Sequence, residues 1–231
     1  MANLLIASLD DGDRARLEPL LETVELSPGQ ILARPGSPAE HVFFPDSGVV
    51  SIAIPDETQM SIGLIGREGF IGLSTQLLAE SSPYLATVEV DRATAQRVST
   101  SQLTLLTRES EGFRTRLLHF GHSFLVQVAQ NGVSAATDNV GQRIARMLLM
   151  LCDRSTDDRI LIVHQQIADM LGVQRTSVTS ALHLLEDSGS VRLRRGVIQI
   201  VDHEALKARA GRTYGVAEEE YRRLFGHGVH G

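Results

Sequence analysis

A run of short polar side chains with one arginine among them, from Gln174 to Ser180, has the composition of a surface that binds DNA. If the run opens a helix, these side chains lie at the end where the helix dipole favours phosphate. Arg175 is the one long cation of the run, and an arginine can bond both O6 and N7 of guanine in the major groove. We predict that Arg175 reads a base, with a phosphate contact as its alternative. The predicted base-reading residues are Gln174, Arg175, Thr176, Ser177, Thr179 and Ser180.

A second basic element follows the first after a short interval. Val191 to Leu193 and Val197 to Val201 are two alternating runs that flank Arg194, Arg195 and Gly196. This pattern predicts a hairpin with a basic tip. On its own an Arg-Arg-Gly turn is typical of an ordinary solvated turn, so its meaning depends on the elements that precede it.

Two short helices are predicted to position this chemistry. Ile167, Ala168 and Leu171 form one apolar face, and Gly172 follows at the position where a left-handed cap is wanted. A second helix starting at Gln174 or Thr176 has its own apolar face, which comprises Val178, Ala181, Leu182 and Leu185. Two helices joined by a short turn that contains glycine are a helix-turn-helix, and with the basic hairpin they predict a winged helix. Ala168 is small enough to let the second helix cross closely over the first.

The first half of the chain has a β pattern. A short helix is predicted over Asp13 to Thr23, and from Val24 to Val98 short apolar or alternating runs are separated by turn-forming residues. The predicted strands are His41 to Phe44, Val49 to Ile54, Met60 to Ile65, Tyr84 to Val90 and Thr94 to Val98. Many short strands at even spacing favour a barrel, roll or sandwich over a parallel sheet.

From about Ser110 the period changes to that of a helix. Its apolar stripe recurs at spacings of three and four and comprises Phe113, Leu117, Phe120, Phe124 and Val128. Such a stripe must pack on its own domain, on another copy of the chain, or on both, and a core helix of one globule is an open alternative. A further helix is predicted to start with Asp138 as its N-cap and to continue through Leu151.

Charge is distributed unevenly along the 231 residues. The net charge is −6, but residues 1 to 137 carry 9 basic and 16 acidic side chains, whereas residues 138 to 231 carry 13 basic and 12 acidic ones. The second half is therefore free to touch DNA. No apolar run approaches the roughly 20 residues that cross a membrane, and the first residues lack the pattern of a secretory signal, so we expect a cytoplasmic protein. Cys152, the lone cysteine, is expected to be a buried and inert thiol.

Three segments carry a resemblance to a known family. IADMLGVQRTSVTSALHLLEDSG, HVFFPDSGVVSI and GREGFIG occur here in the order and spacing of the Crp/Fnr transcription regulators, which the chain resembles over nearly its whole length. The resemblance implies an α+β fold with an N-terminal β-roll of the cyclic-nucleotide-binding type, a cupin-like jelly roll, over residues 1–109. A dimerisation helix over residues 110–137 and a winged helix-turn-helix over residues 138–231 would follow.

The resemblance also assigns roles to residues. It makes the stripe from Phe113 to Val128 the seam of a homodimer, and it gives phosphate contacts to His164 and Gln165 beside Arg194 and Arg195. Its effector pocket would be drawn from Arg67, Glu68, Gly69, Gly72, Leu73 and Thr87. Thr176 and Ser180 stand where better known members often have glutamate and arginine, so the DNA half-site should differ from theirs.

Known effectors of the family fit this sequence poorly. Members that bind cyclic AMP have a Gly-Glu pair where this chain has Gly72 and Leu73, and an arginine that residues 82–87 do not supply. A buried phosphate without a cation carries a large desolvation cost. The N-terminal cysteine cluster of iron-sulfur members is absent, and His41 alone among the early residues could ligate haem. We predict no cofactor, with cyclic AMP, an iron-sulfur cluster and haem all disfavoured, and no metal site.

These observations predict a sequence-specific DNA-binding transcription regulator, not an enzyme, that acts as a homodimer on an inverted repeat. Its expected partners are double-stranded DNA, a second copy of the chain, RNA polymerase and an unidentified small-molecule effector, with no membrane. A dimeric adaptor of the same fold that does not bind DNA is one alternative. A cupin-type metalloenzyme is another, but His41 stands alone in the roll, and His119 and His122 have no evident third ligand.

Overall fold

The N-terminal half is a roll of two antiparallel sheets, in a computed structural model that describes residues 3–55, 60–77, 79, 81–90, 93–155 and 158–229. One sheet has the strand order β1-β7-β3 and the other β2-β6-β4-β5. The strands are β1 (Glu22–Leu26), β2 (Ile31–Ala33), β3 (His41–Pro45), β4 (Val49–Ala53), β5 (Ser61–Ile65), β6 (Leu85–Val90) and β7 (Ala93–Ser99). The five predicted strands are thus confirmed within one or two residues at each end.

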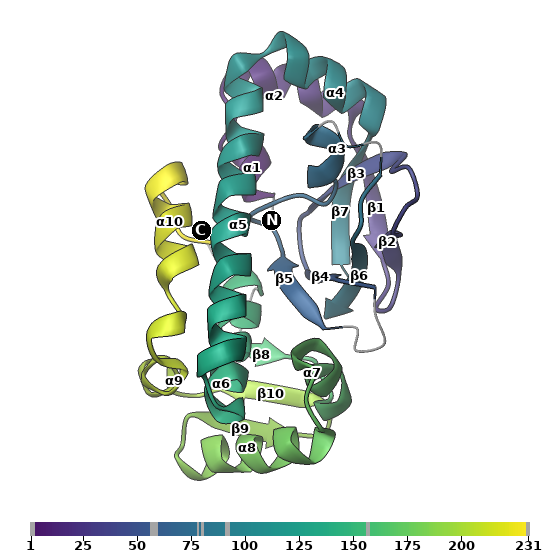
Figure 1. Cartoon of the computed structure of the whole chain (residues 1–231). Helices are drawn as coiled ribbons and strands as arrows, with labels where there is room; N and C mark the ends of the chain where they lie inside the picture. The colour runs from purple at the N-terminus through teal and green to yellow at the C-terminus, as the bar shows by residue number, and fades with distance from the viewer. Residues whose placement is uncertain are drawn as a thin grey trace.

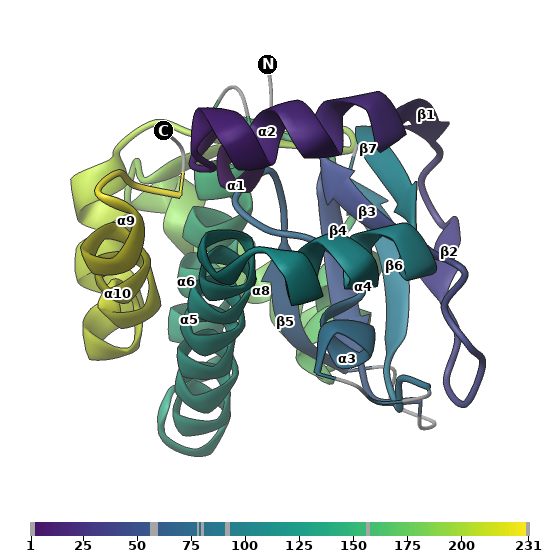
Figure 2. The same ribbon diagram turned by 90° about the horizontal axis from the view of Figure 1, so that it is seen from above.

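Among the described residues, four short helices and a 3₁₀ turn complete this half. They are α1 (Leu4–Ala7), α2 (Asp11–Leu17), the 3₁₀ turn η1 (Glu18–Leu20), α3 (Leu73–Gln76) and α4 (Thr100–Glu109). The helix predicted over Asp13 to Thr23 is wrong at its end, because Pro19 lacks the amide that would continue α2 and Glu22 already belongs to β1. Seen from above, α2 and α4 lie side by side across one end of the roll (Figure 2).

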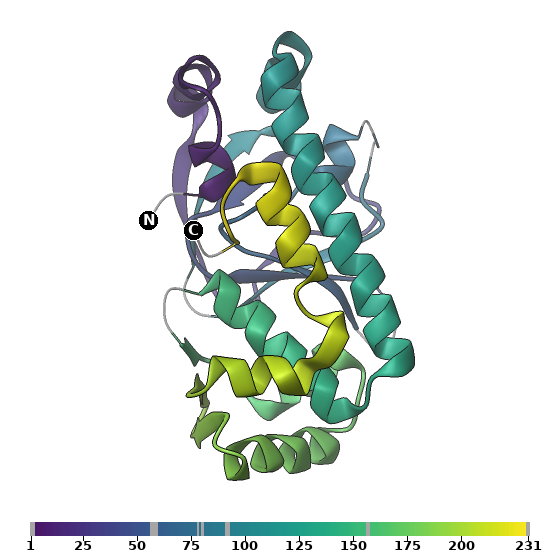
Figure 3. The same cartoon turned by 90° about the vertical axis from the view of Figure 1, so that its left-hand side faces the viewer.

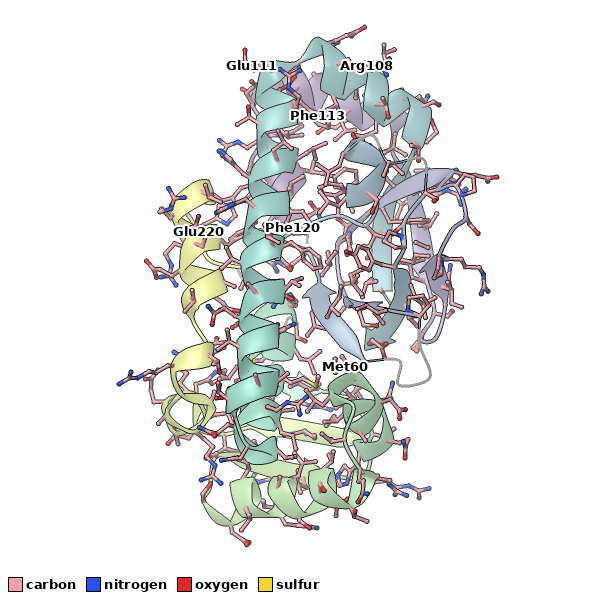
Figure 4. The ribbon with its side chains drawn as sticks, viewed as in Figure 1. Met60, Arg108, Glu111, Phe113, Phe120 and Glu220 are labelled. Atoms are coloured by element: carbon pink, nitrogen blue, oxygen red, sulfur yellow. The ribbon has the colours of Figure 1, made fainter. Side chains whose placement is uncertain are left out.

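The long helix α5 (Glu111–Thr137) runs along the roll and down to the C-terminal half (Figure 1). Phe113, Leu117 and Phe120 are at most 2% exposed and belong to the core of the roll. Figure 4 shows Phe113 and Phe120 on the side of α5 that faces the sheets. Gly69 lets the helix approach, because a Cβ built there would lie 2.0 Å from the ring of Phe120.

The predicted dimer seam therefore needs correction. Phe113, Leu117 and Phe120 pack inside their own chain and are not available to a second copy. Phe124 and Val128 are only partly buried and line a cavity next to the roll. The apolar stripe predicted from Phe113 to Val128 does lie on one side of α5, but its first three residues pack on the chain's own domain.

The C-terminal half is a winged helix around a second apolar core. Its elements are α6 (Val140–Arg154), β8 (Arg159–Ile160), α7 (His164–Leu171), α8 (Arg175–Asp187), β9 (Val191–Arg194), β10 (Val197–Ile200) and α9 (His203–Ala210), with sheet order β8-β10-β9. Asn139, not Asp138, caps α6: its side chain accepts from the amide of Gln142, while Asp138 closes the end of α5.

After a 3₁₀ turn, η2 (Gly211–Thr213), the chain returns to the first half through α10 (Val216–Phe225). Figure 3 shows α10 lying along α5. Tyr221, Phe225 and Val229 belong to the core of the roll, and Glu220 Oε1 lies 2.8 Å from His122 Nε2 of α5. The predicted winged helix-turn-helix segment, residues 138–231, thus ends in a helix that packs on the N-terminal half. No helix in the described part of the chain is both long and apolar enough to span a membrane.

Candidate nucleic-acid interface

The turn between α7 and α8 has the expected geometry. Gly172 adopts the left-handed conformation, with φ of 62°, which an L side chain rarely takes. The amide of Val173 then donates to the carbonyl of Ala168 at 3.0 Å, which closes the end of α7. Ala168 is 1% exposed in the core between the helices. The turn therefore sets the angle at which α8 leaves α7.

The predicted base-reading residues occupy the first two turns of α8. Gln174 is the N-cap, and Gln174, Arg175, Thr176 and Ser180 are exposed. Ser177 and Thr179 are half-buried. The Thr179 hydroxyl donates to the carbonyl of Arg175 at 3.1 Å. Four of the six residues are therefore free to meet a partner directly.

The hairpin of β9 and β10 is the wing, and α8 holds it in place. Residues Arg194 and Val197 pair across its turn, where Gly196 has φ of 72°. The amide of Leu193 donates to Glu186 Oε1 of α8 at 2.8 Å. The basic tip is thus fixed relative to the helix rather than free.

The helix-turn-helix and the wing enclose one groove of about 460 Å³. Its polar lining consists of His164, Gln165, Arg175, His183, Arg194 and Arg195, with Gly196 at the turn. The structure thus brings together all four residues predicted to bind phosphate with the principal predicted base reader. One further residue of the groove was not predicted from the sequence: His183, which lies seven residues beyond Thr176 on the exposed face of α8.

His164 joins α7 to α8 through Thr179. Its Nδ1 lies 2.9 Å from the Thr179 hydroxyl. Burial, followed by the charges of Arg175 and His183, lowers the pKa of His164 below its ordinary value of 6.5. In the free protein these neighbours therefore disfavour the protonated imidazole.

A separate cavity of about 490 Å³ lies between the roll and α5. Of the six predicted pocket residues, Gly72 and Leu73 line it. Its walls are mostly aliphatic or aromatic side chains, among them Ile52, Phe70 and Phe124. Among its described lining residues, His122 and Tyr84 are the only titratable ones, and neither lysine nor arginine occurs.

The other four predicted pocket residues lie elsewhere, which corrects the assignment. Glu68 forms a buried ion pair with Arg154 of α6, with 2.8 Å between Oε1 and Nε. Gly69 faces Phe120, and Arg67 lines a different cleft, between the roll and α10. Ala86 lines the cavity, so Thr87, its neighbour on β6, has its side chain on the opposite face of that strand.

The histidines weighed for a metalloenzyme do not converge. His119 packs edge-on against Phe225, His122 pairs with Glu220, and His41 lies on β3 beside Phe43. These are packing and ion-pair contacts of α5, α10 and the roll.

Family models match both halves of the chain. The model described as a cyclic nucleotide-binding domain matches residues 23–108, and the model described as a Crp-like helix-turn-helix domain matches residues 142–209. Together they cover more than half of the sequence. The chain belongs to the Crp/Fnr family of transcription regulators, whose helix-turn-helix binds DNA, and it is not an enzyme.

One relative agrees with this assignment, and two solved structures share the fold. The HTH-type transcriptional regulator Cmr of Mycobacterium tuberculosis is 26% identical over 211 residues, which are 88% of this chain and 82% of that protein. A CRP-family regulator from Thermus thermophilus has the same fold, with a TM-score of 0.68 and 18% identity over 81% of this chain and 96% of that one. A Crp/Fnr regulator from Eubacterium rectale has a TM-score of 0.67 and 18% sequence identity, over 89% of this chain and 97% of that one.

Proposed function

We propose that this protein is a sequence-specific transcription regulator that binds an inverted-repeat operator as a homodimer. The observation that carries the proposal is the single groove in which the start of α8 and the tip of the wing meet, with Arg175, Arg194 and Arg195 on its walls. A recognition helix enters the major groove by its N-terminal residues, while a basic wing reaches the neighbouring backbone. The presence of both parts in one groove supports the proposal.

Within that groove we assign some residues to base contacts and others to phosphate contacts. Arg175, Thr176 and Ser180 are exposed on α8 and are proposed to meet base edges. Arg194 and Arg195 at the wing, with His164 and Gln165 at the start of α7, are proposed to bind phosphates. A phosphate beside His164 would favour its protonated form.

The homodimer is proposed to form along the outer face of α5. Leu118, Leu125 and Val133 remain 47%, 64% and 47% exposed there. Six exposed or half-buried residues recur along this face at alternating spacings of four and three. They are Leu118, His122, Leu125, Ala129, Gly132 and Ala136. This is the seam of a paired helix, and its small residues permit close approach. Two copies joined in this way would place their α8 helices in successive major grooves, roughly 34–36 Å apart.

The effector is proposed to be an uncharged and largely apolar molecule in the cavity between the roll and α5. The volume of about 490 Å³ is within the usual range for a small ligand. Its described lining lacks the lysine or arginine that a cyclic nucleotide phosphate would need. Because Phe124 and Leu125 line the cavity from α5, a bound molecule would press on the proposed dimer helix.

Selection of bound duplexes from a random pool tests the proposal. We expect recovery of inverted repeats whose half-sites are about 10 base pairs apart. Arg175→Ala should cost about 1–3 kcal/mol on the selected site and relax its sequence preference, whereas Arg195→Ala should weaken binding to all sequences alike. Arg114→Ala, an exposed change on the start of α5, is the matched control and should leave binding unchanged.

Recovery of unrepeated sites only would contradict the dimeric mode of binding. Identical behaviour of the Arg175 and Arg195 variants would contradict the division of roles. Failure to recover any bound duplex would favour the adaptor over the regulator.

A further inference from the structure

Three side chains with metal-binding atoms converge at the back of the DNA-binding domain, away from the groove. They are Cys152 near the end of α6, Asp158 just before β8 and His203 at the start of α9. Asp158 Oδ1 lies 3.6 Å from Cys152 Sγ and 2.9 Å from His203 Nε2, and all three atoms lie within 4.8 Å of one another. Over the described residues this is the one such group of three.

One of the separations equals that which a tetrahedral ion imposes. A zinc ion has its sulfur ligand at about 2.3 Å and its nitrogen and oxygen ligands at about 2.0–2.2 Å, so neighbouring ligand atoms stand about 3.3–3.6 Å apart. The sulfur-to-oxygen distance already agrees. The shorter distance between Asp158 and His203 is that of a hydrogen bond, and an ion between them would need the two atoms to separate by roughly half an ångström.

The scaffold under the three ligands is firmly placed. Cys152 is half-buried on a helix whose inner face is in the second core. The carbonyl of Asp158 accepts from the amide of Ile200 at 2.9 Å, which ties it to β10. His203 follows Asp202, whose carboxylate caps α9 by accepting from the amide of Ala205 at 2.9 Å.

We propose that Cys152, Asp158 and His203 bind a divalent transition-metal ion such as Zn²⁺. A thiolate, a carboxylate and a neutral imidazole form a ligand set that such ions take and that magnesium and calcium do not. The two anionic ligands balance the charge of the ion. Asp158 and His203 are 59% and 42% exposed, so the ion has access from solvent.

All three proposed ligands line a cleft of about 740 Å³ between the DNA-binding domain, the roll and α10. Lys207 of α9, Glu218 of α10 and Arg67 of the roll line the same cleft. Cys152 is two residues from Arg154, whose ion pair with Glu68 connects α6 to the roll. A bound ion would therefore tie α6, the start of β8 and α9 together next to the contact between the two halves. This site is independent of the proposed DNA groove.

Titration of the untagged, chelator-treated full-length protein with Co²⁺ tests the site. We expect one equivalent to bind, with the visible bands of four-coordinate Co²⁺ and a near-ultraviolet thiolate-to-metal band. Cys152→Ser should abolish the thiolate band and weaken binding at least about tenfold, and Asp158→Asn and His203→Gln should weaken binding by a similar factor. His41→Gln, on β3 of the roll, is the matched control and should change neither the bands nor the affinity.

A thermal readout separates loss of the site from loss of the fold. Zn²⁺ should raise the melting temperature of the wild type and not that of Cys152→Ser or His203→Gln, while all three proteins melt alike without metal. Absence of Co²⁺ binding would overturn the proposal. So would binding without a thiolate band, which marks an adventitious ion on surface histidines. None of these readouts depends on DNA binding.

Discussion

Glu89 of β6 is a carboxylate held partly out of water where the roll meets α7. Its Oε1 accepts from the Ser51 hydroxyl at 2.6 Å, and its backbone carbonyl accepts from the Gln166 side chain at 3.3 Å. Burial is the main cause that raises the pKa of Glu89 above 4.5; the Ser51 hydrogen bond opposes it, and the charge of Asp169 adds to it. At neutral pH the ionised form therefore works against the folded state.

Replacing Glu89 with glutamine should stabilise the protein at neutral and alkaline pH. Because the folded-state pKa is raised, the stability that protonated Glu89 contributes is present below the unfolded value of 4.5 and is lost as pH rises through the folded value. Glutamine does not ionise, so the gain should vanish toward about pH 4. Urea unfolding of both proteins across this range measures the difference. A variant less stable than wild type at about pH 8 would contradict the assignment.

Residues in one continuous stretch could be placed from sequence, whereas residues paired across the chain could not. Gln174 to Ser180 occupy the start of α8 as predicted, because helix caps and apolar periodicity are local signals. Glu68 was misplaced in the effector pocket because its partner, Arg154, is 86 residues away. The contact of Cys152 with Asp158, in which Sγ lies 3.6 Å from Oδ1, could not be predicted from the apolar run around Cys152.

At the scale of elements, the loop after β5, helix α6 and helix α10 meet at one buried ion pair. The side chains of Arg154 and Glu68 are 3% and 2% exposed. The Gly66 amide donates to Glu68 Oε2 at 3.0 Å, and the Tyr221 hydroxyl of α10 donates to the Glu68 carbonyl at 3.2 Å. The pair therefore connects α6, and with it the DNA-binding domain, to the roll.

Breaking this pair from one side should be costly. Arg154→Met leaves an uncompensated buried carboxylate, and we expect a loss of about 3–5 kcal/mol in the free energy of unfolding. The double variant Glu68→Gln with Arg154→Met removes the orphaned charge and keeps an acceptor for the Gly66 amide. It should recover most of the loss in a double-mutant cycle measured by urea unfolding. Additive losses would show that the two side chains do not interact.

Elements were predictable where their own pattern specified them. The strands of the roll and both helices of the helix-turn-helix follow from alternation, helical periodicity and turn residues. The surface against which a helical face packs cannot be predicted in this way. The stripe with Phe113 and Phe120 fits a dimer seam and a domain core equally well. The position of α10 on α5 is likewise a tertiary contact that no local pattern reports.

At the scale of the whole molecule, the two halves meet at a joint lined by methionines. Met60, Met147, Met150 and Met170 line one cavity of about 200 Å³ between β5, α5, α6 and α7. Methionine is flexible and polarizable, so such a joint can repack without losing contact. We expect an effector in the neighbouring cavity to shift the balance between two arrangements of the DNA-binding domain and the roll.

Disruption of the outer face of α5 should dissociate the proposed homodimer. Leu125→Arg places a charge in the middle of the proposed seam, where burial against a second copy would be unfavourable. Sedimentation should then report a monomer, with DNA affinity lower than that of the wild type. Leu105→Arg makes the same change at an exposed leucine of α4 and should leave the dimer intact. Equal dimerisation of both variants would place the interface elsewhere.

The central claim is that two copies of the α8 groove act together on one duplex. Analytical ultracentrifugation of the protein with a fluorescent duplex at low ionic strength tests it most directly, because electrostatic contacts are strongest under that condition. We predict a dimer in the absence of DNA and two chains per duplex in its presence. A lone monomer without measurable affinity for the duplex would contradict the account.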